Sequence, residues 1–146
     1  MPGLLRNIPI LAGLDDSALR LLWEHAFENK VPARSVIVQE GDEGNRLFLI
    51  AKGSVRVSRH FGRPDEIELA QFGPGDFFGE MCILETLPRA ATVQAIENTL
   101  LYSLTSVTFY HLYETMPRQH SILLLNIARD LSRRLRHLDE VFAAKH

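Results

Sequence analysis

Hydrophobic residues recur at two different spacings along the chain, and the change of spacing divides it into three parts. From Leu14 to Phe27 the apolar residues follow helical spacing, and Asp15 and Asp16 are placed to cap the start of a helix. After Pro32 the pattern changes to short apolar runs separated by glycine-containing turns, which is typical of β-strands. Helical spacing returns at 106–115 and from 118 to about 143. The predicted order is helix, sheet, helices.

The middle part of the chain reads as a series of short strands. The segments EGDEGN, KG, FGRPD and FGPGD supply the turns between them. Many short strands with such turns favour a sandwich or barrel over a parallel sheet. The predicted strands are Ser35–Gln39, Leu47–Ala51, Ser54–Arg59, Glu66–Gln71, Ala91–Ile96 and Thr99–Leu104.

The last predicted helix contains a second pattern, a heptad seam flanked by several arginines. The seam consists of Leu124, Ala128, Leu131, Leu135, Leu138 and Phe142, and the arginines are Arg129, Arg133, Arg134 and Arg136. Two interpretations remain open: a helix that packs on its own sheet with a solvated charged face, or a parallel helix pair that holds a homodimer. Two to three heptads form only a marginal coiled coil, so the sheets would have to contribute to a dimer.

The bulk composition restricts the class of protein. The 146 residues suit one domain with a sizeable core, and a net charge of −2 supplies no field that would attract DNA or an anionic membrane. Cys82 is the single cysteine, so no intrachain disulfide can form and a reducing compartment is indicated. No apolar run approaches the ~20 residues of a membrane span, and no signal peptide opens the chain. We therefore expect a cytoplasmic protein.

The segment FGPGDFFGEMCILETLPRAATV, residues 72–93, carries the candidate chemistry. A carboxylate such as Glu80 accepts hydrogen bonds from sugar hydroxyls, and an arginine fork such as Arg89 binds a phosphate. A helical turn at 79–84 would direct its first backbone amides at the same anion, and Gly79 would let backbone and ligand approach closely. These groups suit a rigid ligand that carries a hydroxyl and a phosphate, such as a nucleoside cyclic monophosphate.

This segment resembles the phosphate-binding cassette of cyclic-nucleotide-binding domains, as in bacterial cyclic-AMP receptor proteins and protein kinase A regulatory subunits. The family pattern stands here as Phe78-Gly79-Glu80 and as PRAATV at 88–93, and VIVQEGDEGNRLFLIAKGSVRV upstream resembles the family's first strands. The resemblance implies an α+β fold, a jelly-roll-like antiparallel β-barrel with an N-terminal helix and C-terminal helices. It implies one domain over 1–146: a helix at about 14–29, a barrel at about 31–104 with the cassette at 78–93, and helices at about 106–143.

The resemblance also assigns the ligand contacts. The Glu80 carboxylate would take the ribose 2′-hydroxyl, Arg89 would take the phosphate, and the Cys82 amide would donate to the phosphate. Val57 and Leu69 fall on strands whose side chains touch the purine. The implied ligand-binding set is Gly79, Glu80, Met81, Cys82, Arg89, Ala90, Ala91, Val57 and Leu69.

Two features bear on which base is recognised. Members selective for cyclic GMP tend to carry threonine directly after the arginine, and Ala90 at this position favours cyclic AMP. The bacterial receptors use a Thr-Ser pair on the long helix to contact adenine, whereas the matching positions here are Leu138 and Asp139. Base recognition through that helix is therefore in doubt, and Arg129 or Arg133 is a candidate lid over the base.

The predicted function is a regulatory sensor that binds cyclic AMP and transmits the ligand state through its C-terminal helix to a downstream effector. Alternatives are the ligand-binding half of a longer transcription factor, channel or transporter, and a degenerate dimerisation scaffold. No DNA-binding domain is recognisable after Pro117, and neither a metal site nor a cofactor is expected. The six histidines form no His-x-His pair and are expected on the surface, and no catalytic motif appears, so an enzyme is not expected.

Overall fold

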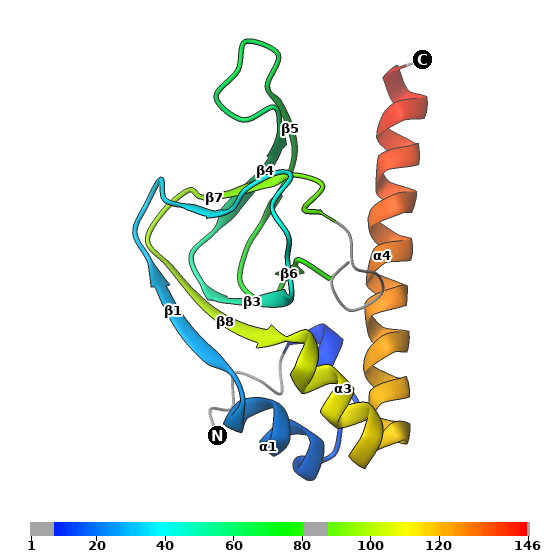
Figure 1. Ribbon diagram of the computed structural model, residues 1–146. Helices are drawn as coiled ribbons and strands as arrows, with labels where there is room; N and C mark the ends of the chain where they lie inside the picture. The colour runs from blue at the N-terminus through cyan, green and yellow to red at the C-terminus, as the bar shows by residue number, and fades with distance from the viewer. Residues whose placement is uncertain (1–7, 81–87, 146) are drawn as a thin grey trace.

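The computed structural model describes residues 8–80 and 88–145 as two antiparallel sheets accompanied by helices (Figure 1). One sheet has the strand order β1-β8-β3-β6 and the other β2-β7-β4-β5. The strands are β1 (Phe27–Val31), β2 (Val36–Val38), β3 (Arg46–Lys52), β4 (Val55–Arg59), β5 (Ile67–Phe72), β6 (Phe77–Phe78), β7 (Thr92–Ala95) and β8 (Thr99–Thr105). The helical elements are η2 (Pro9–Leu11), α1 (Asp16–Glu24), α3 (Ser106–Thr115) and α4 (Pro117–Lys145). The predicted jelly-roll-like fold with flanking helices is confirmed.

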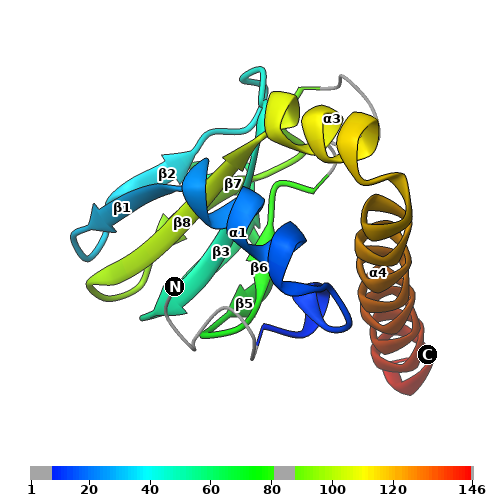
Figure 2. The ribbon, with the colours of Figure 1, turned by 90° about the horizontal axis from the view of Figure 1, so that it is seen from below.

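The first sheet separates two hydrophobic clusters because successive side chains along its strands point to opposite faces of the sheet. Phe48 and Ile50 of β3 face the second sheet, where they join a cluster that includes Val55 and Val93. On the other face of β3, Leu47 and Leu49 pack with helix residues of η2, α1, α3 and α4. Figure 2 shows α1 lying across β8 and β3 on this helix-covered side. The helices therefore close one face of the first sheet, and the second cluster fills part of the space between the two sheets.

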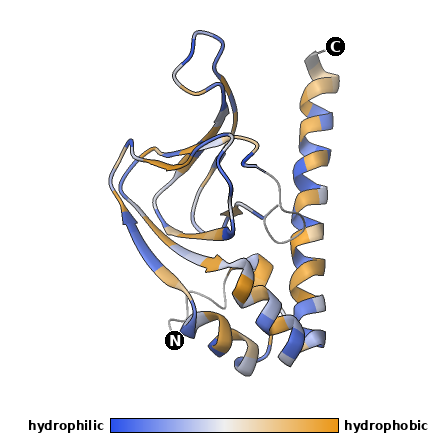
Figure 3. Ribbon diagram, viewed as in Figure 1, coloured by the Kyte–Doolittle hydropathy of each residue, from blue (hydrophilic) through white to orange (hydrophobic). Residues whose placement is uncertain are grey.

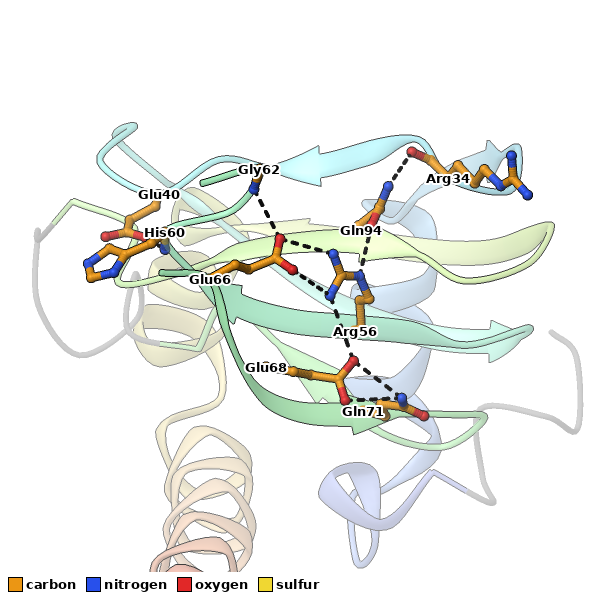
Figure 4. A network of polar contacts seen from close by, with 9 residues as sticks. All are labelled: Arg34, Glu40, Arg56, His60, Gly62, Glu66, Glu68, Gln71 and Gln94. Atoms are coloured by element: carbon orange, nitrogen blue, oxygen red, sulfur yellow. Dashed lines mark hydrogen bonds and ion pairs between the residues drawn. The ribbon is translucent and has the colours of Figure 1, made fainter. Parts of the chain in front are cut away.

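The outer face of the second sheet carries a network of polar contacts centred on Arg56 (Figure 4). The Arg56 guanidinium lies 3.1 Å from the Glu66 carboxylate and donates to the Gln94 amide oxygen at 2.9 Å. The Gly62 backbone N–H, followed by the Arg56 side chain, donates to Glu66 and holds the pKa of its carboxyl below the usual value. The network joins β4, β5 and β7 from outside, so the inner face of the same strands is free to line a cavity.

The first helix is shorter than predicted, and a strand follows it. The sequence pattern extended this helix to Phe27, or to about residue 29, but α1 ends at Glu24, and 27–31 form β1, which pairs with β8. Both predictions for this segment were wrong. The strand is mostly exposed along FENKV, so no apolar alternation marks it, and its pairing with 99–103 is a tertiary contact that the local sequence does not contain.

Helix α4 buries a stripe that begins one residue before the heptad seam and meets it at Leu131. Leu123 and Ile127 are buried in the helix-side cluster, with Leu131 packed against it. The later seam residues Leu135 and Leu138 are 62% and 55% exposed. Figure 3 shows hydrophobic positions continuing along α4 beyond the part that contacts α3. Of the helices in 8–80 and 88–145, none is long and apolar enough to cross a membrane.

The Asn126 side chain ties α4 to the N-terminal segment. The Asn126 Nδ2 group donates to the backbone oxygens of Ile10 at 2.9 Å and Ala12 at 2.7 Å. We expect Asn126→Ala to lower the free energy of unfolding by about 1 kcal/mol, because two hydrogen bonds are lost while helix propensity rises slightly. Urea denaturation measures the change, with Arg129→Ala, an exposed position on α4, as the control. A loss no larger than that of the control would contradict this role.

Candidate functional site

A large cavity lies between α4, the cassette and the inner face of the second sheet. Its volume is about 710 Å³, within the usual range of small-molecule sites. Its wall combines apolar strand residues with charged side chains from the cassette and α4. The lining residues are Val38, Gly44, Val57, Leu69, Ala70, Gln71, Phe72, Phe78, Gly79, Glu80, Pro88, Arg89, Ala90, Ala91, Val93, Arg133, Arg134, His137 and Leu138.

Arg89 is the half-buried cation of the cavity. Its guanidinium donates to the backbone oxygens of Arg46 at 3.0 Å and Gly79 at 3.4 Å, and its Cζ atom lies 6.0 Å from the centre of the Phe48 ring. A guanidinium has five N–H groups, so these two bonds orient the side chain and leave donors for an anion. Two backbone oxygens hold the group in place, and among residues 8–80 and 88–145 no carboxylate pairs with it.

Two glycines make room for this guanidinium. A Cβ atom on Gly44 would overlap the Nε and Cζ atoms of Arg89, and one on Gly79 would lie 2.6 Å from the Arg46 oxygen and 2.7 Å from Arg89 Nη1. Gly79 also has a φ of +83°, which side-chain-bearing residues rarely adopt. The Arg89 backbone N–H donates to the Asp42 oxygen at 2.7 Å, which fixes the cassette against the turn that contains Gly44.

Glu80 is half-buried and lines the same cavity as Arg89. A carboxylate and a guanidinium thus face one space, and no ion pair between them is recorded. Two other predicted contacts, Met81 and Cys82, lie outside the described residues, as does most of the predicted turn at 79–84.

The strand wall of the cavity is apolar. Val57 of β4 and Leu69 of β5 both line it, and their contact with a base stays a prediction. Ala90 and Ala91 also line it and follow Arg89 directly, so their short side chains leave space beside the guanidinium. Within the described part of the chain, no group of three His, Cys, Asp or Glu side chains could hold a metal ion.

Arg134 holds α4 against the strand that leads into the cassette. Its guanidinium donates to the Phe77 backbone oxygen at 2.8 Å and pairs with Asp130, one turn earlier, at 2.7 Å. The Arg134 Cζ atom also lies 4.3 Å from the ring centres of both Phe72 and Phe77. This contact joins α4 to the residue two positions before Gly79, so the helix and the cassette are mechanically connected.

The remaining α4 residues divide between the cavity and the solvent. Arg133 lines the cavity, in agreement with its candidacy as a lid, and Arg129 does not. Leu138 lines it too, whereas Asp139 is outside the lining. His137, expected to be a plain surface residue, is exposed but forms part of the cavity wall.

Sequence reasoning missed the parts of the site that depend on distant contacts. Gly44 was recognised only as a turn residue, and its packing against Arg89 joins positions 45 residues apart. Arg134 was noted only as one of several arginines around the seam, and the lid role was assigned to Arg129 or Arg133 instead. The spacing of Arg133 and His137, one helical turn apart, was the one local signal that both could reach the same space.

Comparison with known proteins agrees with this geometry. Residues 28–116 match the family model described as "Cyclic nucleotide-binding domain". A cyclic AMP receptor protein of Thermus thermophilus is 33% identical over 92% of this chain, and a cyclic nucleotide-gated potassium channel of Mesorhizobium japonicum is 36% identical over 78% of it. The crystal structure of the Thermus thermophilus catabolite activator protein superposes with a TM-score of 0.76 at 34% identity, over 93% of this chain and 62% of that one.

The chain belongs to the cyclic nucleotide-binding domain family, as the family model and the fold together show. It is a cyclic nucleotide-binding regulatory domain of the jelly-roll type. The chain spans 61% of the length of the matched receptor and 30% of the length of the matched channel.

The packing of Gly44 against Arg89 leads to a specific expectation for Gly44→Ala. The added methyl group would displace the far end of the Arg89 side chain, which is flexible, so the fold should survive with stability within about 1 kcal/mol of wild type. Nucleotide affinity should fall about tenfold or more because the phosphate donors are moved. Isothermal titration and thermal unfolding measure both quantities.

Gly73→Ala is the matched control, because a Cβ atom there has no neighbour within 4 Å and the backbone is not in the left-handed region. Equal affinities for the two alanine variants would show that Gly44 does not position Arg89.

Proposed function

We propose that this domain binds cyclic AMP, with its phosphate on Arg89 and its ribose 2′-hydroxyl on Glu80. The observation that carries the proposal is the placement of Arg89 on two backbone carbonyls with spare N–H donors, on the same cavity as Glu80. A cyclic phosphate carries one negative charge, which a guanidinium binds well, and the ribose hydroxyl suits a carboxylate acceptor. The apolar strand residues Val57 and Leu69 would pack on the purine.

The choice of adenine rests on Ala90. In the family, a threonine directly after the arginine is associated with guanine, and Ala90 here lines the cavity with a methyl group. Cyclic GMP would lack a hydroxyl partner at that position. We therefore place cyclic AMP first and cyclic GMP second, and we propose no catalytic step and no metal or cofactor.

In this proposal, α4 transmits the binding of the ligand to the effector. A ligand shifts an equilibrium only if it binds one conformation better than another. Arg134 joins α4 to Phe77, which lies next to the cassette, so a change of the cassette around the phosphate would alter how α4 is held. In this proposal residues 1–146 act as one sensor module. The matched receptor and channel are longer than this chain, so its effector is either a separate protein or a further part of its own polypeptide.

The site assignment is tested with Arg89→Gln. The variant loses charge-assisted bonds to the phosphate, so we expect cyclic AMP to bind about 100-fold more weakly, or about 3 kcal/mol. Isothermal titration with cyclic AMP and cyclic GMP measures this change. Arg20→Gln, an exposed position on α1, is the control, and thermal unfolding shows that each variant is folded.

Unchanged affinity in Arg89→Gln would refute the phosphate site. If wild type binds neither mononucleotide, the proposed function itself fails, and a cyclic dinucleotide or a role as a degenerate scaffold becomes the next hypothesis. The cavity of about 710 Å³ and the arginine held on backbone oxygens beside it argue against the scaffold, because a scaffold needs neither.

We also propose that the exposed half of the seam pairs two copies of the chain through α4. Leu135 is 62% exposed and Leu138 is 55% exposed, although both are large and apolar. The buried stripe of α4 runs through Leu123 and Ile127, so packing inside the domain does not use the later seam residues. The two interpretations of this helix are thus compatible: its first half packs on the domain, and its second half would meet a partner copy.

Leu135→Glu tests the pairing. We expect wild type to sediment as a dimer and the variant to dissociate at the same concentration, because two glutamates would face each other at the seam. Leu125→Glu is the matched control, since Leu125 is 56% exposed on the same helix but outside the seam. A monomeric wild type, or equal effects of the two changes, would contradict the proposed dimer.

A further inference from the structure

Two histidines that are far apart in the sequence meet on the surface of the helical layer. His25 follows the last residue of α1 and His111 lies on α3, and both are exposed. Their ring centres are 6.0 Å apart, with an angle of 51° between the ring planes. The two helices share one buried cluster, which includes Leu22 of α1 and Leu112 of α3. Helix packing therefore brings the imidazoles together, and no spacing along the chain announces the pair.

The His25 ring is oriented by the backbone of its own helix. Its Nδ1 atom lies 2.8 Å from the Leu21 carbonyl oxygen. A carbonyl oxygen can only accept, so Nδ1 carries the proton and Nε2 of the neutral ring keeps its lone pair. Histidines that bind metal ions usually donate their other ring N–H to a carbonyl or carboxylate, which fixes the tautomer and the ring orientation. His25 has the hydrogen bond that is typical of a metal ligand.

The separation of the two rings fits a single shared ion. A Zn²⁺ ion lies about 2.0–2.1 Å from an imidazole nitrogen, which puts it roughly 3.2 Å from the ring centre. Two rings that share the ion then have centres about 5 to 6.5 Å apart, for N–Zn–N angles from tetrahedral to linear. The observed 6.0 Å lies in this range. The His111 ring has no recorded hydrogen bond in the described part of the chain, so it is able to turn a nitrogen toward the ion.

The electrostatic setting of the pair favours a cation. The C-terminal end of a helix carries the negative end of its dipole, and His25 lies at that end of α1. Glu24 precedes His25 directly, and Glu114 is three residues after His111 on α3; both are exposed. Among residues 8–80 and 88–145, no third His, Cys, Asp or Glu completes a ready-made group with the pair. Water would therefore fill the other positions around a bound ion.

We propose that His25 and His111 together bind one divalent ion of the zinc type, which joins the C-terminal end of α1 to α3. Imidazole nitrogen suits Zn²⁺, Cu²⁺ and Ni²⁺, whereas Mg²⁺ and Ca²⁺ prefer oxygen ligands. Neither histidine lines the nucleotide cavity, and both helices pack on the opposite face of the first sheet. The ion is thus a clip between two helices with no part in nucleotide binding, and the inference is independent of the proposed function.

The first test is isothermal titration of the whole chain with zinc chloride at about pH 7.5, where imidazole is neutral. Two ligands supply roughly half the binding free energy of a four-ligand zinc site, so we expect one equivalent with a Kd on the order of 10 to 100 µM. Trp23 is the single tryptophan and lies two residues from His25, so quenching of its fluorescence by Cu²⁺ gives a local second readout. Magnesium chloride should give neither signal.

The second test asks whether the two histidines hold the same ion. His25→Ala and His111→Ala should each weaken zinc binding tenfold or more. The double variant should be little weaker than either single variant, because one imidazole alone no longer retains the ion. His137→Gln removes an exposed histidine of α4 and is the matched control, with zinc affinity unchanged.

Thermal unfolding separates metal binding from a structural role of the rings. Without metal, His111→Ala should unfold close to the wild-type temperature, because its ring makes no recorded hydrogen bond among the described residues. With excess zinc, the unfolding temperature of wild type should rise by several degrees, since the ion binds the folded state, and this rise should vanish in His111→Ala.

Three outcomes would overturn the inference. One is zinc binding that persists unchanged in His111→Ala, or that falls equally in His137→Gln. Another is the binding of two equivalents of zinc, one lost with each histidine, which would show separate ions. The third is a wild type that gives neither zinc heat nor quenching by Cu²⁺. None of these results bears on cyclic AMP, and a chain that binds no cyclic mononucleotide would leave the zinc result unaffected, so the failures of the two proposals are distinguishable.

Discussion

The site depends on one constraint: a guanidinium is held half-buried by backbone oxygens, and no carboxylate in the described part of the chain pairs with it. Removing such a group from water is costly unless its donors find acceptors. The chain meets this cost with the backbone oxygens of Arg46 and Gly79, which carry no net charge. A carboxylate partner would orient Arg89 as well, but it would cancel the positive charge that an anionic ligand needs. The two glycines beside Arg89 follow from the same constraint, because carbonyls can reach it only where no Cβ atom intervenes.

Arg133 and Arg134 are adjacent on α4 but have different surroundings, because they point in different directions from the helix. Arg134 lies against Phe72 and Phe77 and is paired with Asp130, so its charge is satisfied inside the protein. Arg133 is about 100° further around the helix, reaches the cavity and has no recorded partner among the described residues. Exchanging the two roles would require rotation of α4, and the Asn126 contacts at its beginning oppose such a rotation.

Local sequence was sufficient wherever the structure repeats a local rule. Alternating apolar residues and glycine turns located the main strands, and the cassette could be recognised because Gly79, Glu80 and Arg89 lie within eleven residues of one another. Strand β1 was missed because FENKV has no alternation to detect and exists as a strand through its pairing with β8. The support of Arg89 by Gly44, and the difference between Arg133 and Arg134, depend on which segments meet in space. No spacing along the chain contains that information.

The two ends of the cavity differ in how far they can adjust. The Arg89 end is built from backbone oxygens and glycines, which have little freedom to adjust. The α4 wall is built from exposed side chains, and Arg134 is the recorded contact that ties this wall to β6. A ligand that contacts both ends would therefore fix the position of α4 relative to the more rigid end. Since the exposed half of the seam continues along the same helix, any change in the position of α4 reaches the surface proposed for pairing.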